Sequence, residues 1–411
     1  MKFNKWTLGL AAVGVVSLTS AVRADESKMS QVQTALSNTT ISGYVDVSAQ
    51  WNIENQNGFY ANGAGIGVPP YAYSAGKADG FNLNSVDLAI DRPQDESSWA
   101  AGYHVELQLG PDNPTGGIFG TTAGSGAIRQ AYITLRTPVG NGIDWKIGVF
   151  DTIIGYESST DGNNPNHTRS YGYSIEPTTH TGVLATYKAF DWLTVQAGVA
   201  NSSNVGTPTA AINGRVTYES QKTFMGAIGL TAPESWGWAK GGALNFGIIH
   251  SLDGSPYTSG AGTRDNLYAG ITVPTPWDKL KFGASFDALV WANSTPVVNP
   301  NDDYSYAAAV YATVQATEKL SFSARGEYFV DGASNLGLYS GAVFPSYAPQ
   351  VTVEAITFTA QYNLWANVLS RLEFRWDHVE SGTPFGANAG VTGDPNHGDS
   401  FILAANLIYQ F

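Results

Sequence analysis

Side chains alternate between apolar and polar along many short segments of the chain. In residues 371–378, Leu372, Phe374 and Trp376 alternate with charged residues. Residues 320–328 and 400–411 repeat the pattern, although Ile402 and Ile408 stand among the polar positions of the last segment. Successive side chains of a strand point to opposite faces, so this period predicts strands with one apolar face. Because Arg or Lys facing lipid at mid-bilayer costs roughly 2–4 kcal/mol, only the apolar face can meet a membrane.

The alternation predicts a series of strands with short and long connections between them. The expected strands are residues 40–53, 80–92, 97–110, 126–137, 143–150, 180–188, 191–201, 212–220, 222–232, 242–252, 263–274, 278–292, 303–316, 318–331, 351–362, 368–380 and 399–411. A barrel with both chain ends on one side of a membrane needs an even number of strands, and this series is odd. The short–long alternation slips between about 202 and 262, where a strand is missed or 242–252 is not a full crossing. Sixteen strands are favoured, and eighteen stay open.

The connections predict an all-β transmembrane antiparallel barrel with short periplasmic turns and long external loops. The expected short turns are Arg92 to Ser97, Thr137 to Gly142, Ala189 to Asp191, Glu219 to Lys222, Thr275 to Asp278, Ala316 to Glu318 and Asn363 to Asn367. The long connections, such as 54–79, 111–125, 151–179, 332–350 and 381–398, are rich in Gly, Asn, Ser, Asp and Pro.

The first 24 residues have the layout of a secretory signal peptide, with Lys2 and Lys5 before an apolar stretch and a Val-x-Ala ending at Ala24. We expect a signal peptide at 1–24, a short polar segment at 25–38 and the barrel at 39–411. No later segment offers about 18 consecutive apolar residues, the length of a transmembrane helix. The formal net charge of −13 disfavours nucleic-acid binding, and the absence of cysteine excludes disulfides and thiolate metal sites.

Aromatic residues gather beside the expected short turns. Amphipathic rings prefer the membrane interface, where barrels have aromatic girdles. Tryptophans filling the core of a soluble sandwich are the alternative reading. The expected girdle consists of Trp99, Trp145, Trp192, Trp277, Trp365, Tyr409 and Phe411.

Several motifs together resemble the OmpL-like β-barrel porin family of outer membranes, and the likeness covers most of the sequence after the signal peptide. They include Ile41-Ser-Gly-Tyr-Val-Asp46, Phe81-Asn-Leu-Asn84, Leu109-Gly-Pro-Asp112, Gln130-Ala-Tyr132, Gly148-Val-Phe-Asp-Thr152, Gly155-Tyr-Glu157, Arg169-Ser-Tyr171, Thr179-His-Thr-Gly182, Arg371-Leu-Glu-Phe-Arg-Trp-Asp-His378 and Tyr409-Gln-Phe411. The resemblance implies a pore-forming barrel and does not identify the solute.

Barrels of about 16 strands leave an aqueous lumen, so the polar parity is expected to face water inside. That rule assigns to the lumen Asp46, Glu106, Lys146, Arg325, Glu327, Arg371, Glu373, Arg375 and Asp377. The two charged strands near the C-terminus flank one strand with a small or polar parity, Ala355, Thr357, Thr359 and Gln361, which predicts a mixed-charge wall. These charges would select solutes, or only pair across strands and hydrate the lumen.

The long connection 151–179 is the expected constriction. A connection of this length without its own strands is usually functional or disordered. Folded inward, its charges would orient dipolar solutes and select ions; as a surface loop it would do neither. The residues expected to act there are Asp151, Tyr156, Glu157, Asp161, Arg169 and Tyr171, with His167 nearby.

The leading expectation is a passive channel for small hydrophilic solutes and ions with a mild cation preference, because acidic residues are in excess. A substrate-specific channel with Tyr156 and Tyr171 on a sugar track, a barrel-scaffold hydrolase and a structural or adhesive barrel are alternatives. The histidines lack His-Glu-x-x-His spacing and no Gly-x-Ser-x-Gly elbow occurs, so no enzyme is expected. No cofactor or metal is expected, the expected partners are lipid and small solutes, and a homotrimer is one option.

Overall fold

The computed structural model describes residues 32–33, 39–53, 72, 77–113, 128–203, 221–252, 263–292, 304–331, 350–380 and 398–411. The predicted signal peptide at 1–24 lies outside these ranges. Of the predicted polar segment 25–38, Val32–Gln33 forms the two-residue strand β1, which pairs with the start of β2. No helix in the described ranges is long and apolar enough to cross a membrane.

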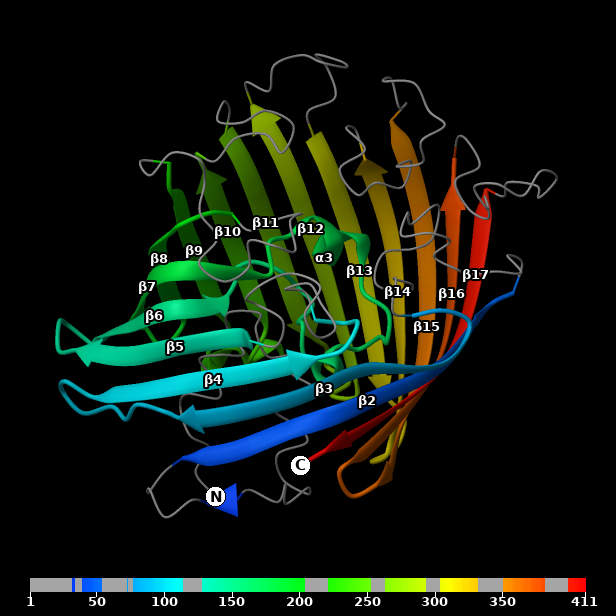
Figure 1. Ribbon diagram of the computed structural model, residues 1–411, viewed down its shortest axis with the longest axis horizontal. Helices are drawn as coiled ribbons and strands as arrows, with labels where there is room; N and C mark the ends of the chain where they lie inside the picture. Colours follow the sequence, from blue (N-terminus) through cyan, green and yellow to red (C-terminus); the bar gives the residue numbers. More distant parts are fainter. Residues whose placement is uncertain are drawn as a thin grey trace.

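Sixteen antiparallel strands form a closed barrel, which confirms the favoured strand number and excludes eighteen (Figure 1). They are β2 Thr40–Asn52, β3 Gly80–Arg92, β4 Ala101–Leu109, β5 Ile128–Thr137, β6 Ile143–Asp151, β7 Thr179–Phe190, β8 Leu193–Ala200, β9 Thr223–Thr231, β10 Ala243–Ser251, β11 Thr263–Pro274, β12 Leu280–Ala292, β13 Tyr304–Gln315, β14 Leu320–Asp331, β15 Val351–Trp365, β16 Val368–Val379 and β17 Asp399–Gln410. Each strand pairs with its neighbours in sequence, and β17 pairs with β2 to close the sheet.

The chain between β8 and β10 settles where the short–long alternation slips. β8 pairs directly with β9, while the strand predicted at 212–220 and part of the turn predicted at Glu219 to Lys222 lie outside the described ranges. The short connection before β10 is 232–242, which contains the 3-10 helix η3 Glu234–Ala239. β10 pairs with both β9 and β11, so the reading of 242–252 as an incomplete crossing is wrong. Short and long connections therefore alternate between the strands of the barrel.

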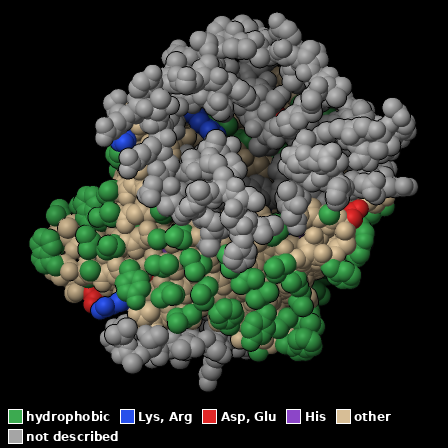
Figure 2. Space-filling model, in the orientation of Figure 1, with side chains coloured by type: hydrophobic (Ala, Val, Ile, Leu, Met, Phe, Trp, Pro, Cys, Tyr) green, Lys and Arg blue, Asp and Glu red, His purple; other side chains and the backbone are tan. Residues whose placement is uncertain are grey.

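The alternating side chains divide between the two faces of the barrel wall as the period of two requires. On β16, Leu372 and Phe374 are exposed on the outside, whereas Arg371, Glu373 and Arg375 are buried on the inside. Hydrophobic side chains cover much of the described wall that faces the viewer in Figure 2. A closed barrel with this exterior satisfies its backbone hydrogen bonds internally, which a bilayer demands.

The two isoleucines that interrupt the C-terminal pattern have partners inside the barrel. Ile408 is fully buried in a small cluster with Tyr44 and Leu369. Ile402 packs with Ala72. The interior of this barrel therefore contains apolar contacts as well as charges.

Candidate functional site: the inward loop and the charged wall

The connection between β6 and β7, residues 152–178 (hereafter the inward loop), lies inside the barrel (Figure 1). It contains the 3-10 turn η2 Asp161–Asn163 and the short helix α3 Tyr171–Ile175, which contacts β12, β13 and β14. The Ser170 hydroxyl caps α3 by accepting a hydrogen bond from Tyr173 N at 3.1 Å. Gly155 has φ 115°, a backbone conformation that favours glycine.

Three arginines of β14 and β16 donate hydrogen bonds to main-chain carbonyl oxygens of the inward loop. Arg325 Nη1 lies 2.7 Å from Thr168 O. Arg371 Nη2 lies 2.7 Å from Asn164 O, and Arg375 Nη1 lies 2.7 Å from Arg169 O. Charge-assisted hydrogen bonds of this kind are stronger than neutral ones, so the arginines hold the loop against the wall.

Carboxylates of the same strands accept hydrogen bonds from the loop. Glu373 accepts from His167 N at 2.5 Å and from Thr168 N and Oγ1 at 2.9 and 2.6 Å. Glu327 accepts from Tyr171 N at 2.7 Å. The loop N–H groups would otherwise be buried without partners, which costs roughly 1–3 kcal/mol each.

These acids and bases also pair with one another. Arg325 bridges Glu157 of the loop at 2.8 Å and Glu327 at 2.7 Å, and its side chain is fully buried. Arg375 pairs with Asp377 at 2.8 Å. We call the six wall residues the charged wall: Arg325, Glu327, Arg371, Glu373, Arg375 and Asp377. The structure brings all six together on the inner face, where they contact the loop and are at most 7% exposed.

An apolar contact reinforces the polar ones beneath α3. The ring of Tyr171 stacks on Phe329 of β14 with centroids 4.9 Å apart, and its hydroxyl donates to Asp377 at 2.9 Å. Ile175 packs in the same buried cluster, beside Leu289 and Val353. Tyr156 similarly stacks on Tyr311 with centroids 4.1 Å apart. Both tyrosines predicted for a sugar track therefore have a ring face against the barrel wall.

Strands β2, β4 and β6 hold the remaining predicted lumen residues. Asp46 is buried and accepts from Asn84 at 2.7 Å, and Lys146 lies over the ring of Tyr132 at 4.7 Å. Glu106 pairs with Arg129 at 2.8 Å. Strand parity did not predict Arg129 as a lumen residue.

Two β-bulges explain the side chains that parity missed. Glu106 pairs with Gln130 and Leu107 with Ile128, so Arg129 is the extra residue of a bulge. It turns inward and also reaches Asp151 of β6 at 3.0 Å. A second bulge lies in β3, where Asn84 is the extra residue opposite Asp46 and Val47 of β2. The side chain of Asn84 points into the barrel and donates to Asp46. A bulge inserts one residue and redirects side chains locally, and neither of the inserted residues, Arg129 and Asn84, is a glycine that would indicate it.

Aromatic side chains surround the barrel end that has the short connections. Trp99, Trp192, Trp277, Trp365 and Tyr409 are exposed, whereas Trp145 and Phe411 are half-buried. Trp236 and Trp238 of η3 are exposed at the same end and were missed because no short connection was predicted there.

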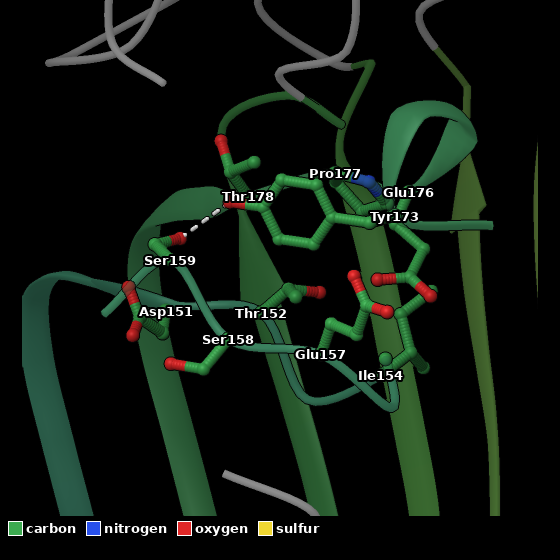
Figure 3. A pocket seen from close by; sticks show the side chains of 11 residues that line it. Asp151, Thr152, Ile154, Glu157, Ser158, Ser159, Tyr173, Glu176, Pro177 and Thr178 are labelled. Atoms are coloured by element: carbon green, nitrogen blue, oxygen red, sulfur yellow. Dashed lines mark hydrogen bonds between the residues drawn. The ribbon is translucent and has the colours of Figure 1, made fainter. Parts of the chain in front are cut away.

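A cavity of about 30 Å³ lies within the inward loop (Figure 3). The carboxyl groups of Asp151, Glu157 and Glu176 line it, and no basic residue does. Ser159 and Tyr173 also line it, and their hydroxyl groups are hydrogen-bonded to each other at 2.8 Å. Burial and then the carboxyl of Asp287 raise the pKa of Glu176 well above its usual value.

Elsewhere in the loop, burial and then nearby Lys77 and Arg371 lower the pKa of His167 well below its usual value, so its imidazole is neutral at pH 7. Among the residues that the structure describes, no three His, Cys, Asp or Glu side chains are grouped to hold a metal ion.

The family model "Putative beta-barrel porin-2, OmpL-like" matches residues 38–411. No curated protein matches the chain. Solved structures share the fold at low identity. The outer membrane channel DcaP of Acinetobacter baumannii is 15% identical with a TM-score of 0.55, and the match covers 92% of this chain and 99% of that one.

An anion-selective porin from Comamonas acidovorans is 11% identical with a TM-score of 0.58, over 91% of this chain and 99% of that chain. The trimer form of OmpT, an outer membrane protein of Vibrio cholerae, is 13% identical with a TM-score of 0.53, over 91% of this chain and 99% of that one. The family match covers most of this sequence, and the solved structures share its barrel architecture. The chain therefore belongs to the OmpL-like family of β-barrel porins.

Proposed function

We propose that the protein is a non-enzymatic channel of the bacterial outer membrane through which small hydrophilic solutes and ions diffuse passively. The observation that supports it is the inward loop, held against the inner face of a closed barrel with an apolar exterior. A barrel of 16 strands is wide enough for an aqueous lumen, and a loop across it reduces the free cross-section. The expected girdle residues would anchor the barrel at the membrane interface, and residues 1–24 would direct its export.

The charged wall supports a revised role for the residues predicted to line the pore. Their hydrogen bonds run to the loop backbone, so we propose that they fix the constriction in place and act on solutes mainly through the field they create. The field of carboxylate and arginine side chains beside a narrow passage orients dipolar solutes.

We predict a mild cation preference. Buried charged residues of the described part comprise eleven carboxylic acids and seven lysines or arginines. A net negative lumen attracts cations and repels anions. In planar bilayers under a salt gradient, the reversal potential should have the sign of a cation-selective pore at neutral pH. An anion-selective reversal potential would reject this charge assignment.

Liposome swelling tests the diffusion function itself. Small sugars, amino acids and dicarboxylates should all enter, at rates that fall with solute size, because no single-solute site is proposed. Saturable uptake of one solute would favour a substrate-specific channel instead. The packing of Tyr156 and Tyr171 on the wall argues for general diffusion. A homotrimer is a further proposal, to be tested by the mass of the detergent-solubilised protein.

A further inference from the structure

The carboxyl group of Glu176, immediately after α3, differs from the other buried carboxylates of the inward loop. Glu157 and Asp161 each pair with an arginine, Arg325 and Arg169 respectively. Glu176 instead forms a side-chain hydrogen bond with another acid, Asp287 of β12. Both residues are buried, at 7% and 3% exposure.

One glycine of the loop lies beside each of these carboxyl groups. A Cβ atom on Gly155 would lie 2.4 Å from Glu176 Oε2, and a Cβ on Gly172 would lie 2.5 Å from Asp287 Oδ2. A larger residue at either position would displace the carboxyl group beside it. Asn266 of β11 donates to Ile175 O at 2.8 Å and fixes the end of α3 near the pair.

Among the residues that the structure describes, no lysine or arginine acts electrostatically on either carboxyl group. From the loop, Glu157 acts electrostatically on Glu176, and Asp151 and Tyr173 line the same cavity. From the wall, the groups on the inner face are Asp287 of β12 and Tyr268 of β11. Arg264, also buried on β11, lies further along that strand, opposite Trp291 rather than Asp287. The guanidinium of Arg325 is bound to Glu157 and Glu327. Two carboxylates in hydrogen-bond contact cannot both be ionised, so one proton between them is the arrangement that this geometry favours.

We propose that Glu176 and Asp287 share one proton and form a latch that holds the end of the inward loop against β12. The docked loop then binds one more proton than a displaced loop at pH values above the usual titration range of Glu. Raising the pH therefore weakens docking, by up to tenfold in the docked-to-displaced ratio for each pH unit, until the docked pair also loses its proton. Lowering the pH restores the latch. The proposed effect of pH on loop docking does not depend on the proposed function. Only an effect of pH on solute passage would depend on it.

Infrared difference spectra of the reconstituted protein test the shared proton. The carbonyl band of a protonated carboxylic acid should persist above the usual titration range of Glu in the wild type. One component of this band should be lost in Glu176→Gln and in Asp287→Asn, and retained in the matched control Glu354→Gln, whose side chain is exposed on the outside of β15. Difference spectra in which both variants leave the band unchanged, or in which the lost component is seen only after a chelator removes a bound cation, would overturn the proposal.

Loop docking has its own readout because the chain has no cysteine. A spin label on Ser174→Cys in α3 should gain mobility as the pH is raised, and this gain should be absent when Glu176→Gln is added, because the Gln amide can donate to Asp287 at any pH. Mobility that is independent of pH without the second substitution would overturn the latch. Neither measurement needs ion flow, so a barrel that carries no current would count against the proposed function alone.

Discussion

Arg325→Met should lower the free energy of unfolding of the barrel by about 3–5 kcal/mol, because it leaves buried acids without their cation. Glu157 and Glu327, which lie 2.8 and 2.7 Å from the guanidinium, would be the carboxylates left unpaired. The loop would also lose the hydrogen bond to Thr168 O. Urea unfolding in lipid vesicles measures the change.

Two further variants give this measurement its controls. Lys188→Met removes a pair with Asp191 at the barrel end, where the lysine side chain is 46% exposed, and should change stability little. Combining Arg325→Met with Glu157→Gln and Glu327→Gln should recover most of the loss, since no buried charge is then unpaired. If Arg325→Met lowers the free energy of unfolding no more than Lys188→Met does, the ion pairs of Arg325 with Glu157 and Glu327 are not buried as described.

Glu373→Ala should raise the single-channel conductance and its fluctuations. The substitution removes the carboxylate that accepts hydrogen bonds from the backbone N–H groups of His167 and Thr168 and from the Thr168 hydroxyl. Each orphaned buried N–H costs roughly 1–3 kcal/mol in the docked state but nothing once the loop leaves the wall and meets water. Each 1.4 kcal/mol shifts the docked-to-displaced ratio about tenfold, so displaced loops with a wider passage become populated.

The control for this variant is Glu354→Ala. Glu354 is on the neighbouring strand β15 but faces outward, so its removal should leave the conductance unchanged. A Glu373→Ala channel with the conductance of the wild type, in a folded barrel, would show that the loop is held without this carboxylate.

Most of the barrel could be predicted from the sequence because the physical cause is local. A strand between lipid and lumen alternates by necessity, so residues 371–378 show both faces directly. Ile402 and Ile408 obscured the alternation because they pack on inward groups that are distant in sequence. The short connection before β10 was missed because η3, with its two tryptophans, resembles neither a tight turn nor a strand.

The site was less predictable because its contacts join residues far apart in the chain. Parity placed Arg325 and Glu373 on the inner face, but only the fold shows that their partners are Thr168 and neighbouring backbone atoms. Arg129 could not be assigned because a bulge, not the alternation, directs its side chain. The pairing of Glu176 with Asp287 likewise joins two segments that are distant in the sequence.

Single-channel recording of the wild type beside a variant with residues 156–176 replaced by a short Gly-Ser linker tests most directly whether the inward loop narrows an open barrel. Both proteins should insert and conduct steadily, and the variant should have the larger conductance. Equal conductances from two folded barrels would contradict the role of the loop as the constriction, and silent membranes with both would contradict the channel itself.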